Sequence, residues 1–104
     1  MSEVAPVIEG KQKQKQKVKR KTPKMFKVVL INDDVTPFDY VIAVLYSVFD
    51  KSPQEAYQIT QNVHQQGRGI AGVYTKQIAQ TKIDQVLTAN ANFGFTLNLE
   101  MEEE

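Results

Sequence analysis

Apolar residues recur along the chain with two periods, one of two residues and one of about 3.6, and short polar segments separate them. Phe26–Ile31 is rich in β-branched residues, which predicts a strand with substantial burial. Residues 67–75 predict a short strand with glycines at its entry and inside it, which indicates a bulge or a close backbone approach. Phe95–Met101 alternates apolar and polar residues, which predicts a half-buried strand.

A first helix is predicted directly after the first strand. Thr36 is expected as its N-cap and Pro37 as its first helical residue, with Asp39 in the first turn. The apolar residues then recur at helical spacing over about 13 residues, which predicts one buried stripe. That stripe comprises Phe38, Val41, Ile42, Leu45, Val48 and Phe49.

Two further helices follow. Ser52, Pro53 and Glu55 form a capping box with proline at the first position, and the helix is expected to end near Gln66, before Gly67. Its buried side is predicted to contain Ala56, Ile59 and Val63, flanked by Tyr57 and Thr60. Thr75 is expected to cap the third helix, which fades around residues 90–92. The inner face of that helix is predicted to comprise Ile78, Ala79, Ile83, Val86 and Leu87.

The order strand, helix, helix, strand, helix, strand predicts an α/β (α+β) fold. We expect a small three-stranded antiparallel sheet, with the three helices packed on one of its faces. The 104 residues suffice for one such domain, which we assign to residues 25–104.

Charge separates the N-terminal segment from this domain. Residues 1–24 contain eight Lys and Arg against two Glu, whereas residues 25–104 contain five against ten, so the balances are +6 and −5. The Lys-Gln segment has almost nothing to bury, which predicts a disordered basic extension. It is interpreted as a solvated tail or tether, or alternatively as an arm that binds nucleic acid or an acidic partner surface. Nucleic acid is the less favoured partner, because the body is acidic and aromatic residues do not interleave with the basic ones.

The absence of cysteine from the sequence excludes disulfides, thiolate metal sites and cysteine nucleophiles. A domain of this kind suits a reducing cytosol. No apolar run approaches the roughly 18 residues of a membrane span, and the N-terminus lacks the apolar core of a signal peptide, so neither a membrane location nor secretion is expected.

The stretch INDDVTPF, residues 31–38, is the main candidate for chemistry. Asp33 and Asp34 could simply form a polar turn that caps the following helix. Alternatively, the two carboxylates and the Asn32 carbonyl, together with His64, form a set of acceptors that suits an ammonium group beside an apolar recess. His64 is the single histidine, and it could equally be a packing or surface residue. The spacing favours neither a metal site nor a catalytic triad, and no cofactor is predicted.

Three stretches resemble the ClpS family of Clp protease adaptors: FKVVLINDDVTPFDYVIAVL, VHQQGRGIAGVYT and AQTKIDQV. The resemblance covers residues 25–102. It implies a binding module and not an enzyme, one that recognises proteins beginning with Leu, Phe, Tyr or Trp and delivers them to a protease. The resemblance implies that the free α-amino group is bound by Asn32, Asp33, Asp34 and His64, with Thr36 beside them. It assigns the pocket for the first side chain to Phe38, Val41, Thr60, Val63 and Leu97.

The resemblance also implies a partner, a hexameric AAA+ unfoldase, ClpA or ClpC. Its N-domain would bind the start of the third helix, at Thr75, Gln77 and Lys82, and residues 1–24 would engage it during transfer. The location implied is the bacterial cytosol, or the plastid stroma in a plant or alga. An alternative role is a regulator that mainly occupies the N-domain and inserts its tail, and deletion of residues 1–24 separates the two roles.

The chain departs from the usual family pattern at four positions. Phe38 and Thr60 stand where methionine is usual, and Gln77 and Gln80 stand where glutamate is usual. Phenylalanine is stiffer than methionine, and threonine is expected to give the pocket a smaller and more polar wall. The two pocket changes are expected to reshape the pocket rather than close it.

Overall fold

The computed structural model describes residues 2–3, 5–6 and 23–104. The body has the predicted order, β3 (Met25–Ile31), α2 (Phe38–Ser47), α3 (Pro53–Gln66), β4 (Arg68–Thr75), α4 (Lys76–Phe93) and β5 (Asn98–Glu103). Before it, β1 (Ser2–Glu3) and β2 (Ala5–Pro6) pair with each other in parallel. The extension predicted to be disordered, residues 1–24, lies mostly outside the described residues.

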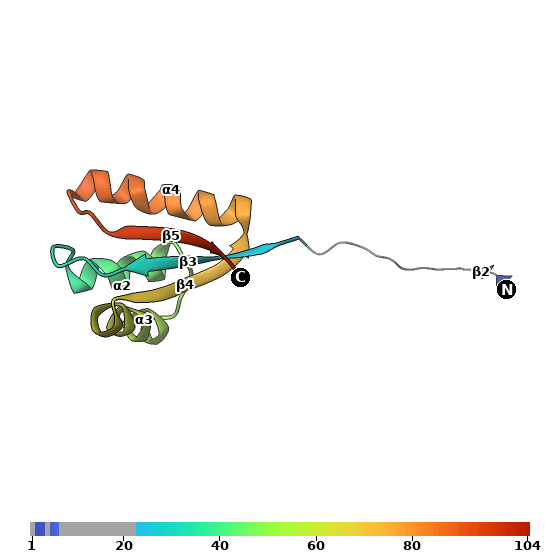
Figure 1. The fold of residues 1–104 in the computed structure, drawn as a ribbon, viewed down its shortest axis with the longest axis horizontal. Coiled ribbons are helices and arrows are strands. Elements are labelled where there is room, and N and C mark those ends of the chain that lie inside the picture. Colours follow the sequence, from blue (N-terminus) through green and yellow to red (C-terminus); the bar gives the residue numbers. More distant parts are fainter. Residues whose placement is uncertain (1, 4, 7–22) are drawn as a thin grey trace.

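The sheet of the body has the order β4–β3–β5, and both neighbours of β3 run antiparallel to it. The helices pack on one face of this sheet, so the predicted fold class is confirmed (Figure 1). The β4–β3 register shifts between Val28 and Val29, so β4 contains the irregularity that its glycines indicated. A Cβ on Gly69 would lie 2.8 Å from Val63 Cγ2, which shows that α3 approaches this strand closely.

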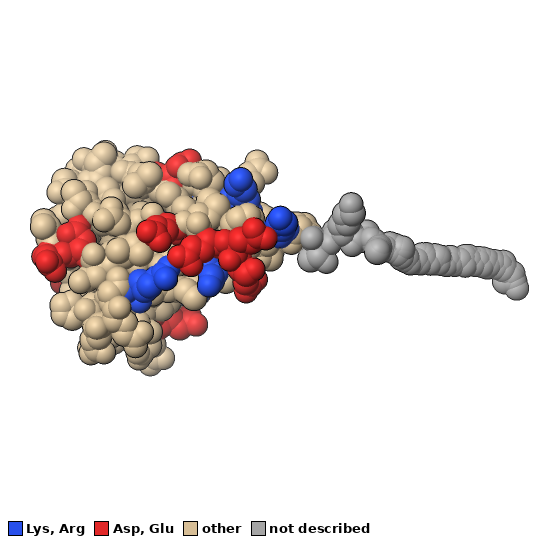
Figure 2. All heavy atoms as spheres, in the orientation of Figure 1, with Lys and Arg blue, Asp and Glu red and all other residues tan. Residues whose placement is uncertain are grey.

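The other face of the sheet is open and charged. Lys27 is paired in register with Glu102, and Ile31 with Arg68, so these side chains share one face. Figure 2 shows acidic side chains in a row across this face, with basic side chains beside them. Side chains alternate between the two faces along β3, so the residues between Lys27 and Ile31 that point the other way pack against the helices.

The core between sheet and helices agrees with most of the predicted apolar positions. Leu30, Leu45 and Leu97 are among the largest fully or almost fully buried side chains. The remaining buried members of the core are Val28, Val41, Val44, Phe49, Ala56, Val63, Ala71, Ala79, Ile83 and Val86. The predicted inner face of α4 was wrong at Ile78 and Leu87, which are each about half exposed. Each lies about 100° around the helix from a buried neighbour, and the buried row continues instead to Asn90.

Two helix starts and one strand differ in detail from the predictions. The N-cap of α2 is Pro37 and not Thr36, because the Thr36 hydroxyl donates to Asp33 Oδ2 at 2.8 Å. Thr75 is the N-cap of α4 but makes no capping hydrogen bond through its side chain. The last strand begins at Asn98, three residues after the predicted start, because Gly94 ends α4 and the chain pairs with β3 only from there.

The predicted start and stop of α3 are confirmed. Ser52 accepts from the Glu55 backbone N–H at 3.2 Å, and the Glu55 carboxylate accepts from the Ser52 N–H at 3.1 Å. At the other end Gly67 adopts φ 89°, a left-handed conformation that favours glycine. These two ends fix the length of the helix that contains His64.

Candidate functional site

A small cavity lies where β3 ends, beside the start of α2 and the second half of α3. Its volume is about 180 Å³. This is below the roughly 300–1,000 Å³ of pockets for drug-sized ligands, so it suits one side chain. Ile31 and the ten predicted residues of the amino-group site and the side-chain pocket line it: Asn32, Asp33, Asp34, Thr36, Phe38, Val41, Thr60, Val63, His64 and Leu97.

The polar rim of this cavity is the turn after β3, and Asp33 organises it. Its carboxylate accepts from the Val35 backbone N–H at 2.9 Å, the Thr36 hydroxyl at 2.8 Å and the Thr96 hydroxyl at 2.6 Å. The Asn32 N–H donates to Gly67 O at 2.8 Å, which ties the turn to the end of α3. Asp33 therefore holds the rim in place through three hydrogen bonds.

Asp34 differs from its neighbour. Within the described part of the chain, no group donates a hydrogen bond to its carboxylate, and the side chain is exposed. The two adjacent acids thus have different surroundings: Asp33 is engaged in the turn, and the Asp34 carboxylate accepts no hydrogen bond from the described residues. Sequence reasoning had not separated them.

The hydrogen bonds to Asp33 lower the pKa of its carboxyl below the ordinary 3.8, and the Thr96 hydroxyl contributes most, followed by the Val35 N–H and Thr36. Replacing Thr96 by Val is therefore expected to raise the pKa of Asp33 toward 3.8, which NMR titration of the carboxyl carbon measures. A carboxyl with a lowered pKa stabilises the fold above its unfolded pKa, and this contribution disappears as the pH falls through the folded pKa. The difference in unfolding free energy between the variant and the parent should therefore shrink at acid pH. If the pKa of Asp33 is the same in the Thr96→Val variant, the role assigned to Thr96 is contradicted.

The aromatic part of the rim is formed by Phe38 between two rings of α3. The Phe38 ring packs edge-on against Tyr57, with centroids 5.8 Å apart, and against His64, with centroids 6.1 Å apart. Tyr57 is half exposed and not part of the buried face as predicted, because it contacts Phe38 at the surface. His64 is exposed beside the ring, so it stands at the mouth of the cavity and not in the core.

The inner walls of the cavity are apolar. Val41, Val63 and Leu97 are buried, and so is Thr60. The Thr60 hydroxyl donates to Ala56 O of its own helix at 2.7 Å, so its donor is already used. The wall at Thr60 is therefore less polar than its residue type had indicated.

The predicted docking residues lie apart from the cavity, at the start of α4. Thr75 is the N-cap and Gln77 is exposed. Lys82 is different, because its Nζ donates to Val48 O at 2.7 Å, lies 3.8 Å from Asp50 Oδ2 and sits 5.4 Å from the centroid of the Tyr74 ring. The Lys82 side chain thus connects α4 to the segment between α2 and α3.

Sequence reasoning missed three residues around the site. Ile31 lines the cavity from the last position of β3, Thr96 holds Asp33, and Gly67 accepts from Asn32. Thr96 had appeared only as an outward position of the predicted last strand, and nothing in the local pattern linked it to a residue 63 positions earlier.

The described residues contain no group of three or more His, Cys, Asp or Glu that could hold a metal ion. The same residues contain no helix with the length and apolar character needed to cross a membrane.

Comparison with known proteins gives consistent results. The family model for "ATP-dependent Clp protease adaptor protein ClpS" matches residues 21–100. The ClpS adapter protein of Paraburkholderia phymatum is 47% identical over 90 residues, which cover 86% of each chain. That of a Burkholderia cenocepacia strain is 46% identical over 97 residues, which cover 93% of this chain and 88% of the relative.

A solved structure is also similar. The structure of Agrobacterium tumefaciens ClpS2 bound to L-phenylalaninamide superposes with a TM-score of 0.76 at 34% sequence identity, covering 80% of this chain and all of the other. The relatives are named as adaptors and not as enzymes. The matched segment includes the turn, the cavity and the three helices, and on these grounds the chain belongs to the ClpS family of ATP-dependent Clp protease adaptors.

Proposed function

We propose that this adaptor recognises proteins by a bulky hydrophobic N-terminal residue and delivers them to a Clp AAA+ unfoldase. The observation that carries the proposal is a cavity that has free acceptors at its mouth and apolar walls behind them. An α-ammonium group and the side chain on the same carbon have this arrangement of charge and apolar surface. The similarity to a ClpS2 structure bound to L-phenylalaninamide, a ligand of that chemistry, supports it.

The α-amino group is assigned to Asn32, Asp34 and His64. An ammonium has three donors, and these three side chains, which all line the cavity, supply separate acceptors. Asp33 and Thr36 contribute by holding the turn, since their polar atoms are already bonded to each other. An acetylated nitrogen has one donor and no charge, so it would leave acceptors unpaired.

The first side chain is assigned to the recess between Phe38, Val41, Thr60, Val63 and Leu97. Four of these residues are buried and bring no free donor to the recess, which favours Leu, Phe, Tyr or Trp over charged side chains. Phe38 is packed against Tyr57 and His64, so the gate position is rigid, and β-branched Ile and Val should fit less well.

Delivery is assigned to the start of α4 and to residues 1–24. Thr75 and Gln77 are available on the surface for the N-domain of ClpA or ClpC, with Lys82 holding the adjacent loop. The named relatives are bacterial, which supports a place in the bacterial cytosol. Nucleic acid is not favoured as a partner, since the open sheet face carries a row of acids (Figure 2).

The proposal is tested by an affinity panel in which only the first residue of a fluorescent peptide changes. We expect Leu, Phe, Tyr and Trp to bind with Kd of about 1 µM or tighter, or about −8 kcal/mol. Ile, Val, Met and Arg should bind at least about tenfold more weakly. Equal affinity across the panel would show that the recess does not read the side chain.

A further inference from the structure

Asn90, near the end of α4, is one of two buried polar residues in the described part of the chain. Both ends of its side-chain amide are used. Nδ2 donates to Leu97 O at 2.9 Å, and Oδ1 accepts from the Tyr40 hydroxyl at 2.8 Å. Because a carbonyl oxygen can only accept, the amide nitrogen must face Leu97 and the amide oxygen Tyr40. The Asn90 side chain is therefore held in one orientation between α2 and the segment that follows α4.

The backbone of Asn90 holds the same segment. Its carbonyl accepts from the N–H of Gly94, which ends α4 at φ 74°, and from the Phe95 N–H at 2.9 Å. The Tyr40 ring also packs on this segment, with its centroid 4.6 Å from that of Phe95. Asn90 and Tyr40 thus determine the path of residues 94–97.

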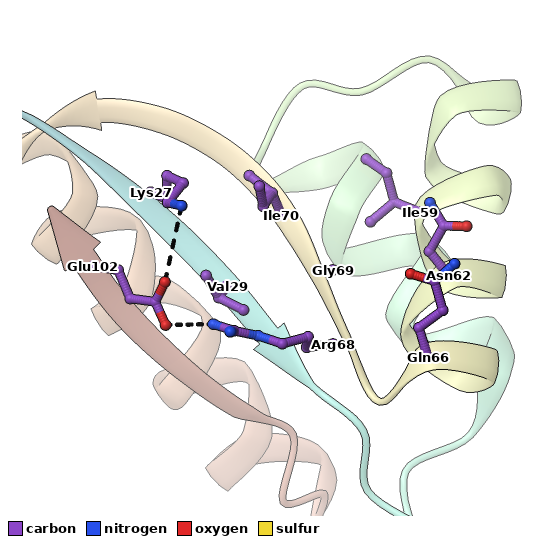
Figure 3. A pocket seen from close by; sticks show the side chains of 9 residues that line it. All are labelled: Lys27, Val29, Ile59, Asn62, Gln66, Arg68, Gly69, Ile70 and Glu102. Atoms are coloured by element: carbon purple, nitrogen blue, oxygen red, sulfur yellow. Dashed lines mark hydrogen bonds and ion pairs between the residues drawn. The ribbon is translucent and has the colours of Figure 1, made fainter. Parts of the chain in front are cut away.

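Residues 94–97 contribute to both halves of the candidate site. The Thr96 hydroxyl donates to Asp33 Oδ2 at 2.6 Å and so holds the polar rim. Leu97 is 2% exposed and forms part of the apolar wall. The segment does not line the larger cavity, of about 420 Å³, which Figure 3 shows among side chains of the three strands and α3. A change in the path of the segment should therefore alter the rim and the recess of the candidate site together.

We infer that Asn90, held by Tyr40, is a positioning residue for selectivity: it fixes Leu97 in the wall of the recess and Thr96 on the Asp33 carboxylate. This inference rests on the proposed function. Asn90 does not line the cavity, so it acts only through residues 94–97. A buried hydrogen-bonded pair adds little net stability over an apolar pair of the same shape, which favours a role in fixing geometry.

The experiment compares Asn90→Ala with the parent, both as full chains, in two measurements. The first is the ratio of the affinities for two peptides that differ only in a first residue of Phe or Val. We expect this ratio to fall at least about threefold, because a loosened Leu97 must be ordered when the side chain enters. The second is NMR titration of the Asp33 carboxyl, whose pKa should rise toward 3.8 because Thr96 is no longer held in place.

Two controls separate positioning from a loss of stability. Ile83→Ala removes a buried side chain two turns earlier on α4 that does not line the cavity. It should destabilise the domain and leave both measurements as in the parent. Asn92→Ala removes an exposed asparagine of the same helix and should change neither stability nor binding.

Tyr40→Phe tests the same inference while keeping the aromatic ring. It removes only the hydroxyl that donates to Asn90 Oδ1, so the affinity ratio should fall by about twofold and the pKa of Asp33 should again rise. Because the packing of the ring remains, this variant should fold even where Asn90→Ala does not. Tyr46→Phe, which removes a hydroxyl from a tyrosine that is about half exposed on the same helix, is its matched control.

The inference is overturned if Asn90→Ala, or Tyr40→Phe where the first does not fold, keeps the parent's affinity ratio or the parent's Asp33 pKa. It is also overturned if Ile83→Ala moves both measurements as far, since the effect would then follow stability alone. Both results leave the proposed function standing, because the parent still binds the Phe peptide better than the Val peptide. If the parent binds neither peptide, the proposed function fails and the inference fails with it.

Discussion

Replacing Asp34 or His64 by Ala is expected to weaken binding of a peptide with a free N-terminal Phe by at least about tenfold. Each substitution removes an acceptor for the α-ammonium, and hydrogen bonds to charged groups are worth about 1.5–3 kcal/mol, or roughly 10- to 150-fold in Kd. Fluorescence anisotropy with a labelled peptide measures the loss.

Matched controls separate this effect from a general change of charge or fold. Asp39→Ala removes an exposed acid of the same helix start that does not line the cavity, and Gln65→Ala alters the residue next to His64. Both controls should bind as the parent does. If Asp34→Ala and His64→Ala also bind like the parent, the ammonium group is not bound at this rim.

The largest expected loss of stability follows from replacing Leu45 by Ala. Leu45 is fully buried between α2 and the sheet, and removing such a side chain costs about 2–5 kcal/mol because a cavity remains. Domains of this size have only about 5–15 kcal/mol in total, so the urea midpoint should fall steeply.

Ile78→Ala is the matched control for Leu45→Ala. Ile78 is about half exposed on α4, and its loss should cost less than about 1 kcal/mol. A similar destabilisation from both variants would mean that Ile78 is buried, as its helical spacing had predicted, and that the described position of α4 is wrong.

The fold could be predicted from the sequence wherever a local signal determines the structure. Ser52, Glu55 and Gly67 define the ends of α3, and their capping geometry depends only on near neighbours. Thr36 had the same local signal, but its hydroxyl donates to the Asp33 carboxylate three residues earlier and does not cap α2. Spacing alone made Ile78 an inner residue, but in the fold the buried row of α4 is the neighbouring one, which contains Ala79 and Ile83.

The candidate site could be predicted in part. The pair of acids, the single histidine and the apolar helix face indicated an ammonium site, and the family resemblance supplied the pocket residues. The division between Asp33 and Asp34 could not be predicted, because it depends on Thr96, which is distant in sequence. The cavity of about 420 Å³ shown in Figure 3 could not be predicted either, since it is formed by side chains of β3, β4, β5 and α3 that meet only in the fold.

The central claim is that the acids at the end of β3 bind a free protein N-terminus. It is tested most directly by the affinity of one peptide beginning with Phe, measured with its α-amino group free and with that group acetylated. We predict micromolar or tighter binding of the free peptide and a loss of at least about a hundredfold on acetylation, since both the charge and the donors disappear. Equal affinity of the two peptides would contradict the account.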